Sequence, residues 1–375
     1  MQDFAFNTRR KFVKVAGAGM LALPLAGVLQ SQAVLAASPG SNAFVAQSAL
    51  NSVSAANTPD PQMQAVLDEL SAFNAPPLET TIPDIARQLP SATNAAMAVL
   101  SKQNKPTVEP VARVEHRIFQ GPASPLVVRI YTPAGSGPFP VIVYFHGGGW
   151  IIANLDTYDP SCRGLTNAAK AIVVSVAYRQ APEYKFPAAP DDSFAAYKWV
   201  LANAASFNGD PNRVAVAGES AGGNLAAVTS IMARDGGVKL PVFQLLVYPV
   251  TDFSKEYASY QEFANAKPLN TGGLKWFGIY YLRSDADKTN PHASVLLTPN
   301  LKGLPPTWLV TAEIDPLRDQ GEDFKTLLIG AGNKVGGARY TGVTHEFFGM
   351  GAAVDTAKKA LAEAAFQLKV AFGTA

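Results

Sequence analysis

The strongest constraint on the fold of this chain is a short motif, Gly218-Glu219-Ser220-Ala221-Gly222. It directly follows an apolar run, Val214 to Ala217, and precedes a helix-forming stretch in which Leu225 and Val228 mark an apolar face. This is the layout of a nucleophile elbow, a strand-turn-helix unit that exposes a serine hydroxyl above a parallel sheet. The glycines permit the unusual backbone angles of the turn. The motif therefore predicts an α/β fold with Ser220 as the candidate nucleophile.

A second glycine-rich motif supports this interpretation, which the first motif alone would carry only weakly. The five-residue pattern would arise by chance in roughly one chain in eight of this length, whereas His-Gly-Gly-Gly would arise in about a few chains per thousand. The chain has His146-Gly147-Gly148-Gly149-Trp150 directly after the apolar run Val141 to Phe145. Attack of a serine on a carbonyl creates an oxyanion, which backbone N–H donors stabilise by about 3–4 kcal/mol each.

The N–H groups expected to form this oxyanion hole belong to Gly148, Gly149 and Ala221, the residue after the candidate nucleophile. Glycines suit such a loop because no side chain obstructs several N–H groups that turn toward one point. His146 and Gly147 are expected to support the loop. We expect His146 to do so by hydrogen bonding and not by proton transfer.

A serine hydroxyl needs a base to remove its proton, and a histidine base needs a carboxylate to fix its tautomer. The four histidines of the chain are His116, His146, His292 and His345. Only His345 follows a well-placed acid, Asp315, which lies just past an apolar strand. Ser220, Asp315 and His345 then form one of the chain orders known for catalytic triads. His116 and His292 are expected to be surface or loop residues.

Taken together, the motifs resemble the hormone-sensitive-lipase branch of the α/β-hydrolases, the bacterial family IV esterases. The resemblance runs from about Pro59 to the C-terminus, and its segments are His146–Trp150, Tyr178–Ala189, Asp191-Asp192, Gly218–Asn224, Asp315–Asp319 and His345. It implies an α/β-hydrolase fold, with a mostly parallel eight-stranded sheet, helices on both faces and a helical cap. It also implies that Ser220 is the nucleophile, His345 the general base and acid, and Asp315 the orienting carboxylate.

Two positions depart from the family pattern, but neither is a triad member. Glu219 stands where Asp is usual, and Glu346 stands where Gly usually follows the histidine. Glu346 lies beside the expected base, so it bears on the shape and charge of the pocket for the alcohol part of an ester. A Gly-Glu-Ser-Ala-Gly elbow also occurs in the type B carboxylesterases, but those chains are far longer.

Apolar runs predict eight strands, and the later runs alternate with helical stretches, which indicates a mostly parallel sheet covered on both faces. The predicted strands are Val114–Phe119, Val127–Tyr131, Val141–Phe145, Ile172–Ala177, Val214–Ala217, Phe243–Val247, Trp308–Thr311 and Ala338–Tyr340. Asp191 and Asp192 are expected to complement the N-terminus of the helix that follows them.

Two further segments are expected to form the cap, residues 59–108 and residues 252–294. The first contains apolar residues at helical spacing, Met63, Val66, Leu67, Leu70 and Phe73. The second interrupts the alternation with many aromatic residues. The resemblance implies that the two segments join over the active site, where some of the aromatic side chains would line an acyl or aryl pocket.

The N-terminus resembles an export signal that is removed. Arg9-Arg10 precede an apolar stretch, Val15 to Leu29, and small residues around Ala36 would admit a peptidase. Residues 1–36 are therefore predicted to be a twin-arginine-type signal peptide and residues 37–58 a flexible linker, with residues 59–375 as the hydrolase domain. The stretch is shorter than the ~20 residues that span a bilayer, so no stable membrane span is expected after processing. The protein is expected to meet the twin-arginine machinery and to be periplasmic or secreted.

Charge and composition exclude several other functions. The first 36 residues have four basic residues and one acidic residue, which contribute +3 to the whole-chain charge of +2 and leave the remainder near −1. No nucleic-acid partner is expected, because no basic stripe with interleaved aromatics occurs. The single cysteine, Cys162, allows no internal disulfide, and no metal-ligand spacing or phosphate loop is present, so no cofactor is expected.

The sequence therefore predicts a serine carboxylesterase that hydrolyses small to medium acyl esters through an acyl-enzyme. A lactonase, an aryl esterase or an acyltransferase on the same site is the nearest alternative, because only the acceptor or the ester differs. A ligand-binding protein on the same fold is a more remote alternative, since fold does not fix function. The sequence carries no signal for an oligomeric state.

Overall fold

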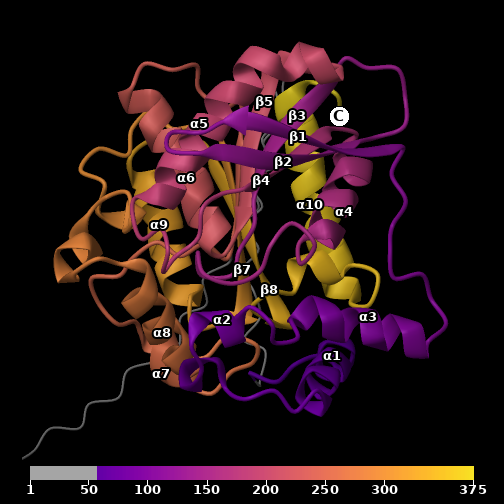
Figure 1. The fold of residues 1–375 in the computed structure, drawn as a ribbon, viewed down its shortest axis with the longest axis vertical. Helices are drawn as coiled ribbons and strands as arrows, with labels where there is room; N and C mark the ends of the chain where they lie inside the picture. The colour runs from indigo at the N-terminus through magenta and orange to yellow at the C-terminus, as the bar shows by residue number, and fades with distance from the viewer. Residues whose placement is uncertain (1–56) are drawn as a thin grey trace, which may run out of the picture. The chain divides into compact units, whose positions relative to one another are not determined.

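The computed structural model of the protein describes residues 57–375 (Figure 1). The predicted export signal, residues 1–36, and nearly all of the predicted linker, residues 37–58, lie outside the described residues. Over residues 57–375, no helix combines the length and the apolar character that crossing a membrane would require.

An eight-stranded sheet forms the centre of the described chain, as the sequence predicts, with the strand order β1-β2-β4-β3-β5-β6-β7-β8. Strand β2 runs antiparallel to β1 and β4, and all other neighbouring strands are parallel. The bounds are β1 Arg113–Gln120, β2 Pro125–Thr132, β3 Phe139–Phe145, β4 Ile172–Ala177, β5 Gly209–Glu219, β6 Gln244–Val247, β7 Thr307–Ile314 and β8 Val335–Thr344. Each predicted strand overlaps one of these.

The central strands form continuous apolar runs in the sequence because both of their faces are covered. Every residue of β3 is buried. Val141 and Val143 pack into one hydrophobic core, whereas Ile142 and Tyr144 pack into a second core on the opposite face. The edge strand β1 instead alternates between exposed and partly covered residues and carries several charged side chains, which discourages pairing with another sheet.

Helices cover both faces of the sheet (Figure 1). Apolar residues of α5 (Ala188–Asn203), α6 (Ala221–Asp235) and α9 (Arg318–Gly330) share the core that contains Val141. Apolar residues of α4 (Asp159–Ala169) and α10 (Asp355–Phe372) share the core that contains Ile142. Short 3₁₀ turns connect the elements, at η1 Leu78–Thr80, η2 Ala204–Phe207, η3 Asp285–Thr289, η4 Val295–Leu297 and η5 Phe348–Met350.

Two groups of helices lie outside this layered part and line one cavity together with residues that follow β3, β5 and β8. The first group is α1 (Pro61–Ala72), α2 (Pro83–Ala86) and α3 (Ala92–Lys102), and the second is α7 (Ala258–Glu262) and α8 (Thr271–Tyr281). The indole N–H of Trp276 donates to the Thr81 carbonyl at 2.8 Å and joins the two groups. These helices fall within the segments predicted to form the cap.

Side-chain hydrogen bonds fix the starts of the N-terminal helices. The Asp60 carboxylate accepts from the Met63 N–H at 2.7 Å at the start of α1, and Ser91 forms a capping box with Asn94 at the start of α3. Met63, Val66 and Leu67 are buried as predicted. Phe73 is 39% exposed, because α1 ends one residue before it.

The expectation for Asp192 is wrong. It is the fifth residue of α5, and its buried carboxylate accepts hydrogen bonds from Arg179, at 2.7 Å from Nη2 and 2.9 Å from the backbone N–H. Leaving a buried carboxylate without a charged partner costs more free energy than leaving a helix end without a side-chain cap. Asp192 therefore ties the loop after β4 to α5.

Candidate active site

Ser220 lies in the sharp turn between β5 and α6 and has φ +57° and ψ −119°. A residue with a Cβ rarely adopts a positive φ, so the surroundings must offset the strain. The Ser220 N–H donates to the Val247 carbonyl at 2.9 Å, and its carbonyl accepts from Val250 at 3.2 Å. Gly222 has no room for a side chain, because a Cβ there would lie 1.9 Å from the Phe145 carbonyl oxygen. This crowding confirms the tight strand-turn-helix unit predicted from the motif.

Three of the predicted site residues form one continuous hydrogen-bonded chain. His345 Nε2 is 2.9 Å from Ser220 Oγ, and His345 Nδ1 is 2.7 Å from Asp315 Oδ2. All three side chains are buried. Burial by itself lowers the pKa of His345, but the carboxylates of Asp315, Glu346 and Glu219 together outweigh burial, and the pKa ends above the usual 6.5.

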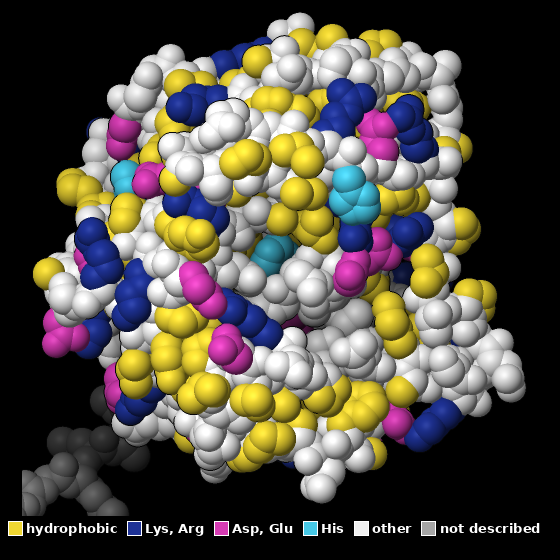
Figure 2. Space-filling model, in the orientation of Figure 1, with side chains coloured by type: hydrophobic (Ala, Val, Ile, Leu, Met, Phe, Trp, Pro, Cys, Tyr) yellow, Lys and Arg dark blue, Asp and Glu magenta, His cyan; other side chains and the backbone are white. Residues whose placement is uncertain are grey.

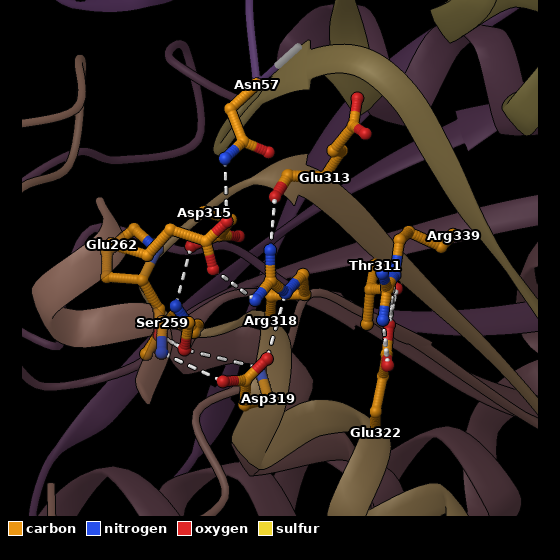
Figure 3. A network of polar contacts seen from close by, with 12 residues as sticks. Asn57, Ser259, Glu262, Thr311, Glu313, Asp315, Arg318, Asp319, Glu322 and Arg339 are labelled. Atoms are coloured by element: carbon orange, nitrogen blue, oxygen red, sulfur yellow. Dashed lines mark hydrogen bonds and ion pairs between the residues drawn. The ribbon is translucent and has the colours of Figure 1, made fainter. Parts of the chain in front are cut away.

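Asp315 follows β7, and its position is fixed by a second acceptor contact. Its Oδ1 accepts from the Leu317 N–H at 2.8 Å, which leaves Oδ2 for His345. The next acid along the chain, Asp319, has a different role, as Figure 3 shows: it accepts from the Ser259 N–H and from Arg318 Nε. Asp319 thus connects α9 to α7 and makes no contact with His345 in the described part of the chain.

The glycine loop after β3 contains two of the residues predicted to form the oxyanion hole. Gly148 has φ +92° and Gly149 φ +58°, and both line the cavity with Ser220 and His345. A Cβ on Gly149 would lie 2.0 Å from the Phe277 ring of α8. Within residues 57–375, the N–H groups of Gly148, Gly149 and Ala221 donate to no protein acceptor. They are therefore available to a bound oxyanion.

His146 supports this loop from below. Its Nδ1 is 2.8 Å from the Gly147 carbonyl oxygen, and its ring stacks on Tyr178 with centroids 4.4 Å apart. Burial lowers the pKa of His146 to about 4, so the ring is neutral at pH 7 and its Nδ1–H donates to Gly147. Tyr178 also donates to the His146 carbonyl at 2.8 Å. A Cβ on Gly147 would lie 2.2 Å from the Tyr158 hydroxyl, so the loop is confined on that side too.

Glu219, the first departure from the family pattern, lies beneath the elbow and faces away from the cavity. It is buried, and the hydroxyls of Tyr144 and Tyr248 donate to its two carboxylate oxygens. Burial, reinforced by Glu346, raises the pKa of Glu219 to about 7. The Tyr248 ring also packs on the His345 ring, with centroids 4.6 Å apart. Glu219 therefore helps to hold the base through Tyr248.

Glu346, the second departure, lies in the cavity with the triad. Its carboxylate Oε1 is 3.7 Å from His345 Nε2, and both of its oxygens accept from the Tyr158 hydroxyl. Sequence reasoning placed Glu346 beside the base but missed Tyr158, which precedes α4 and is separated from Glu346 by 188 positions.

The other two histidines lie elsewhere, as predicted. His116 is on the edge strand β1, where its Nε2 accepts from Arg129 Nε at 2.9 Å. His292 is partly buried, and burial lowers its pKa. Among the described residues, no group of three or more His, Cys, Asp or Glu side chains is placed to hold a metal ion.

The cavity above the triad has a volume of about 1720 Å³ and is lined by Ser220, His345, Glu346, the glycine loop and residues of both cap segments. In Figure 2 the surface of this face is hollowed, a histidine side chain lies inside the hollow, and both hydrophobic and charged side chains lie around its opening. Phe253 and Phe277 are among the cap aromatics that line the cavity. Trp276 instead packs between the two cap segments, through its bond to Thr81.

Comparisons with known proteins agree with this geometry. The family model for the alpha/beta hydrolase fold matches residues 142–349. Carboxylesterase NlhH of Mycobacterium tuberculosis is 41% identical over 270 residues, which cover 70% of this chain and 84% of that protein. Carboxylic ester hydrolase LipN of the same organism is 44% identical over 237 residues, 61% of this chain and 63% of that protein. A solved hyperthermophilic esterase from the archaeon Pyrobaculum calidifontis matches with a TM-score of 0.76 at 35% identity, and the match covers 85% of this chain and 100% of that one.

These relatives carry names of ester hydrolases, and the matched region contains both glycine motifs, Asp315 and His345. The activity class is thus carboxylic-ester hydrolysis. The resemblance that the motifs predicted is confirmed: the chain belongs to the hormone-sensitive-lipase-like esterases of the α/β-hydrolase superfamily.

Proposed function

We propose that this hydrolase is a serine carboxylesterase in which Ser220 is the nucleophile, His345 the general base and acid, and Asp315 the carboxylate that orients the base. The observation that carries the proposal is the unbroken chain from Ser220 Oγ through the His345 ring to Asp315, with contacts of 2.9 and 2.7 Å. A histidine within hydrogen-bond reach of the serine and oriented by an acid is the arrangement that activates a hydroxyl.

The reaction follows from these contacts in two stages. Ser220 Oγ forms a bond to the ester carbonyl carbon while its proton passes to His345 Nε2. The resulting oxyanion is stabilised by the N–H groups of Gly148, Gly149 and Ala221, worth about 3–4 kcal/mol each in a site that excludes water. The C–O bond to the alcohol then breaks as Nε2 gives its proton to the leaving oxygen. Water repeats the sequence on the acyl-enzyme and frees the acid.

His146 takes no part in proton transfer in this scheme. It is neutral at pH 7, its Nδ1 is engaged by Gly147, and Tyr178 covers its ring. These contacts support a structural role, in which His146 and Gly147 hold Gly148 and Gly149 in the conformation that exposes their N–H groups.

Small to medium acyl esters are the proposed substrates. The cavity has apolar side chains from α8 and from the loop after β6, such as Phe277 and Phe253, which suit an acyl or aryl group. Gly149 and Phe277 are in direct contact, and both line the cavity with Ser220. We expect this contact to limit the length of chain that the enzyme accepts.

Hydrolysis of a p-nitrophenyl ester series from acetyl to dodecanoyl tests both parts of the proposal. The protein is compared with Ser220→Ala and with Ser230→Ala, a matched control that removes a buried hydroxyl two to three turns along the same helix α6. We expect Ser220→Ala to lose at least about 10⁴-fold in kcat/KM and Ser230→Ala to lose little. Activity confined to shorter chains supports the substrate class. Equal activity in Ser220→Ala and the parent would remove Ser220 from the mechanism and favour a ligand-binding role.

A further inference from the structure

Glu346, directly after His345, is a feature that the proposed reaction leaves unexplained. Its φ is +70°, in the left-handed region where a residue with a Cβ is strained. Gly342, four positions earlier, has the same φ and is a glycine. Strain of this kind persists where the surroundings impose it, and it clusters at functional sites. The chain thus keeps a carboxylate where the backbone favours glycine.

Contacts with Tyr158 hold Glu346 in this backbone conformation. The Tyr158 hydroxyl lies 2.6 Å from one oxygen of Glu346 and 2.7 Å from the other. Tyr158 itself is wedged against the glycine loop, because its hydroxyl occupies the place of a Cβ on Gly147. The Glu346 carboxylate is therefore held in one position between the glycine loop and the base.

This position lies on the substrate side of His345. Glu346 lines the cavity together with Ser220 and Gly148, and its side chain is 21% exposed there. Its Oε1 is 3.7 Å from His345 Nε2, the nitrogen that exchanges a proton with Ser220 and with the leaving group. Asp315, in contrast, contacts the other ring nitrogen, Nδ1.

The charge of Glu346 is not neutralised by the protein. Among residues 57–375, His345 is the only basic side chain within 4 Å of its carboxylate. The other titratable groups that act on Glu346 are Tyr158, Asp315 and Glu219, which are neutral or acidic. When it is ionised, Glu346 therefore presents a negative charge to a group that binds beside His345 Nε2.

The alcohol part of an ester binds at that point. To receive its proton, the leaving oxygen must come within about 3 Å of His345 Nε2. A substituent two or three bonds beyond that oxygen then reaches the Glu346 carboxylate. We propose that Glu346 is a specificity-determining residue that selects esters whose alcohol part carries a positive charge, such as the esters of amino alcohols or quaternary ammonium alcohols.

This inference rests on the proposed function, because Ser220 and His345 define the alcohol side of the site. A carboxylate that served only to position His345 would change the hydrolysis of every ester by the same factor. A carboxylate that contacts the alcohol changes one ester relative to another. The ratio of two rate constants therefore separates the two roles.

Acetylcholine and 3,3-dimethylbutyl acetate provide the test, because they have nearly the same shape and differ in charge. The measurement is the ratio of their kcat/KM values in the parent protein, in Glu346→Gln and in Glu346→Gly. Burial raises the pKa of Glu346, partly offset by His345, so the assay is run on the alkaline side of neutral, at about pH 8, which favours the ionised carboxylate. We expect both substitutions to lower the ratio about tenfold in favour of the neutral ester.

Glu256→Gln is the matched control, since Glu256 also lines the cavity but is exposed and pairs with Lys275 at 2.9 Å. Its ratio should equal that of the parent. An unchanged ratio in both Glu346 variants, or an equal fall of the ratio in Glu256→Gln, would overturn the inference about Glu346. The proposed function would still stand in that case if hydrolysis of the neutral ester depended on Ser220. Glu346→Gly also removes the backbone strain, so it keeps the test informative if Glu346→Gln folds poorly. Hydrolysis that did not depend on Ser220 would instead contradict the proposed function itself.

Discussion

Asp315 controls the rate without touching the substrate, because it fixes the ring and the tautomer of His345. In Asp315→Asn the side chain can present an N–H group where an acceptor is needed, which favours the wrong tautomer. We expect kcat to fall about 10³- to 10⁴-fold with little change in KM, measured on p-nitrophenyl acetate. Asp319→Asn is the control, since Asp319 pairs with Arg318 and Ser259 but not with His345. Equal losses in the two variants would contradict the assignment of Asp315.

The His345 ring also sets the acid limb of the pH profile. Burial disfavours its protonation, but Asp315 first and Glu346 second favour it, so its pKa lies above 6.5. Only the neutral ring accepts the Ser220 proton, and kcat/KM is therefore expected to rise with pH through this pKa. Glu346→Gln removes a negative charge 3.7 Å from Nε2 and destabilises the protonated ring.

The acid limb of the variant should therefore move to lower pH, by about half a unit. A kcat/KM profile of p-nitrophenyl acetate between about pH 5 and 9 measures the shift. Movement of the limb to higher pH would show that Glu346 does not act on the base as a charge.

At the scale of elements, the contact between the glycine loop and helix α8 decides whether the N–H donors are in place. A Cβ on Gly149 would lie 2.0 Å from the Phe277 ring, whereas Gly237, with a similar φ of +63°, has nothing within 4 Å. Alanine at either position strains the backbone by about 1–2 kcal/mol. Only at Gly149 does it also collide with α8 and displace the loop.

We therefore expect Gly149→Ala to lower kcat/KM at least about 100-fold, the range seen when an oxyanion donor is lost. Gly237→Ala should lower the melting temperature slightly and leave kcat/KM unchanged. Adding Phe277→Ala to Gly149→Ala removes the collision and should restore part of the rate. The same loss of kcat/KM in Gly237→Ala would mean that general destabilisation, and not loop position, explains the effect.

At the scale of the whole molecule, the features that can be predicted from the sequence are those determined by residues that are neighbours along the chain. Strand β3 is a continuous apolar run because it is buried on both faces. The elbow is visible because Gly218, Ser220 and Gly222 lie at and directly after the apolar end of β5. His345 could be identified because few histidines compete for its role, and its contact with Asp315 follows from chain order on this fold. These predictions required no knowledge of side-chain packing.

The features that sequence reasoning missed depend on packing between distant segments. Tyr144 and Tyr248 meet Glu219 across separations of 75 and 29 positions, and Tyr158 meets Glu346 across 188. Each tyrosine looks like an ordinary core residue in the sequence. The sequence around Asp192 predicts a helix cap because its neighbours indicate a helix start, whereas Arg179 lies beside it only in the folded chain. Local patterns do not encode such pairs.

Export is the remaining prediction for the whole molecule, and it concerns residues outside the described range. We propose that the Arg9-Arg10 pair directs the folded protein through the twin-arginine route. The body of the chain suits this route, because its one cysteine, Cys162, is buried and the fold needs no disulfide formed after transport. Replacing both arginines with lysine keeps the charge but removes the pattern that the machinery reads. We expect the esterase activity of this variant to move from the exported fraction to the cytoplasm. Lys14→Arg leaves the arginine pair intact and should be exported like the parent protein. Unchanged export of the double-lysine variant would show that residues 1–36 are read as a general signal and not as a twin-arginine one.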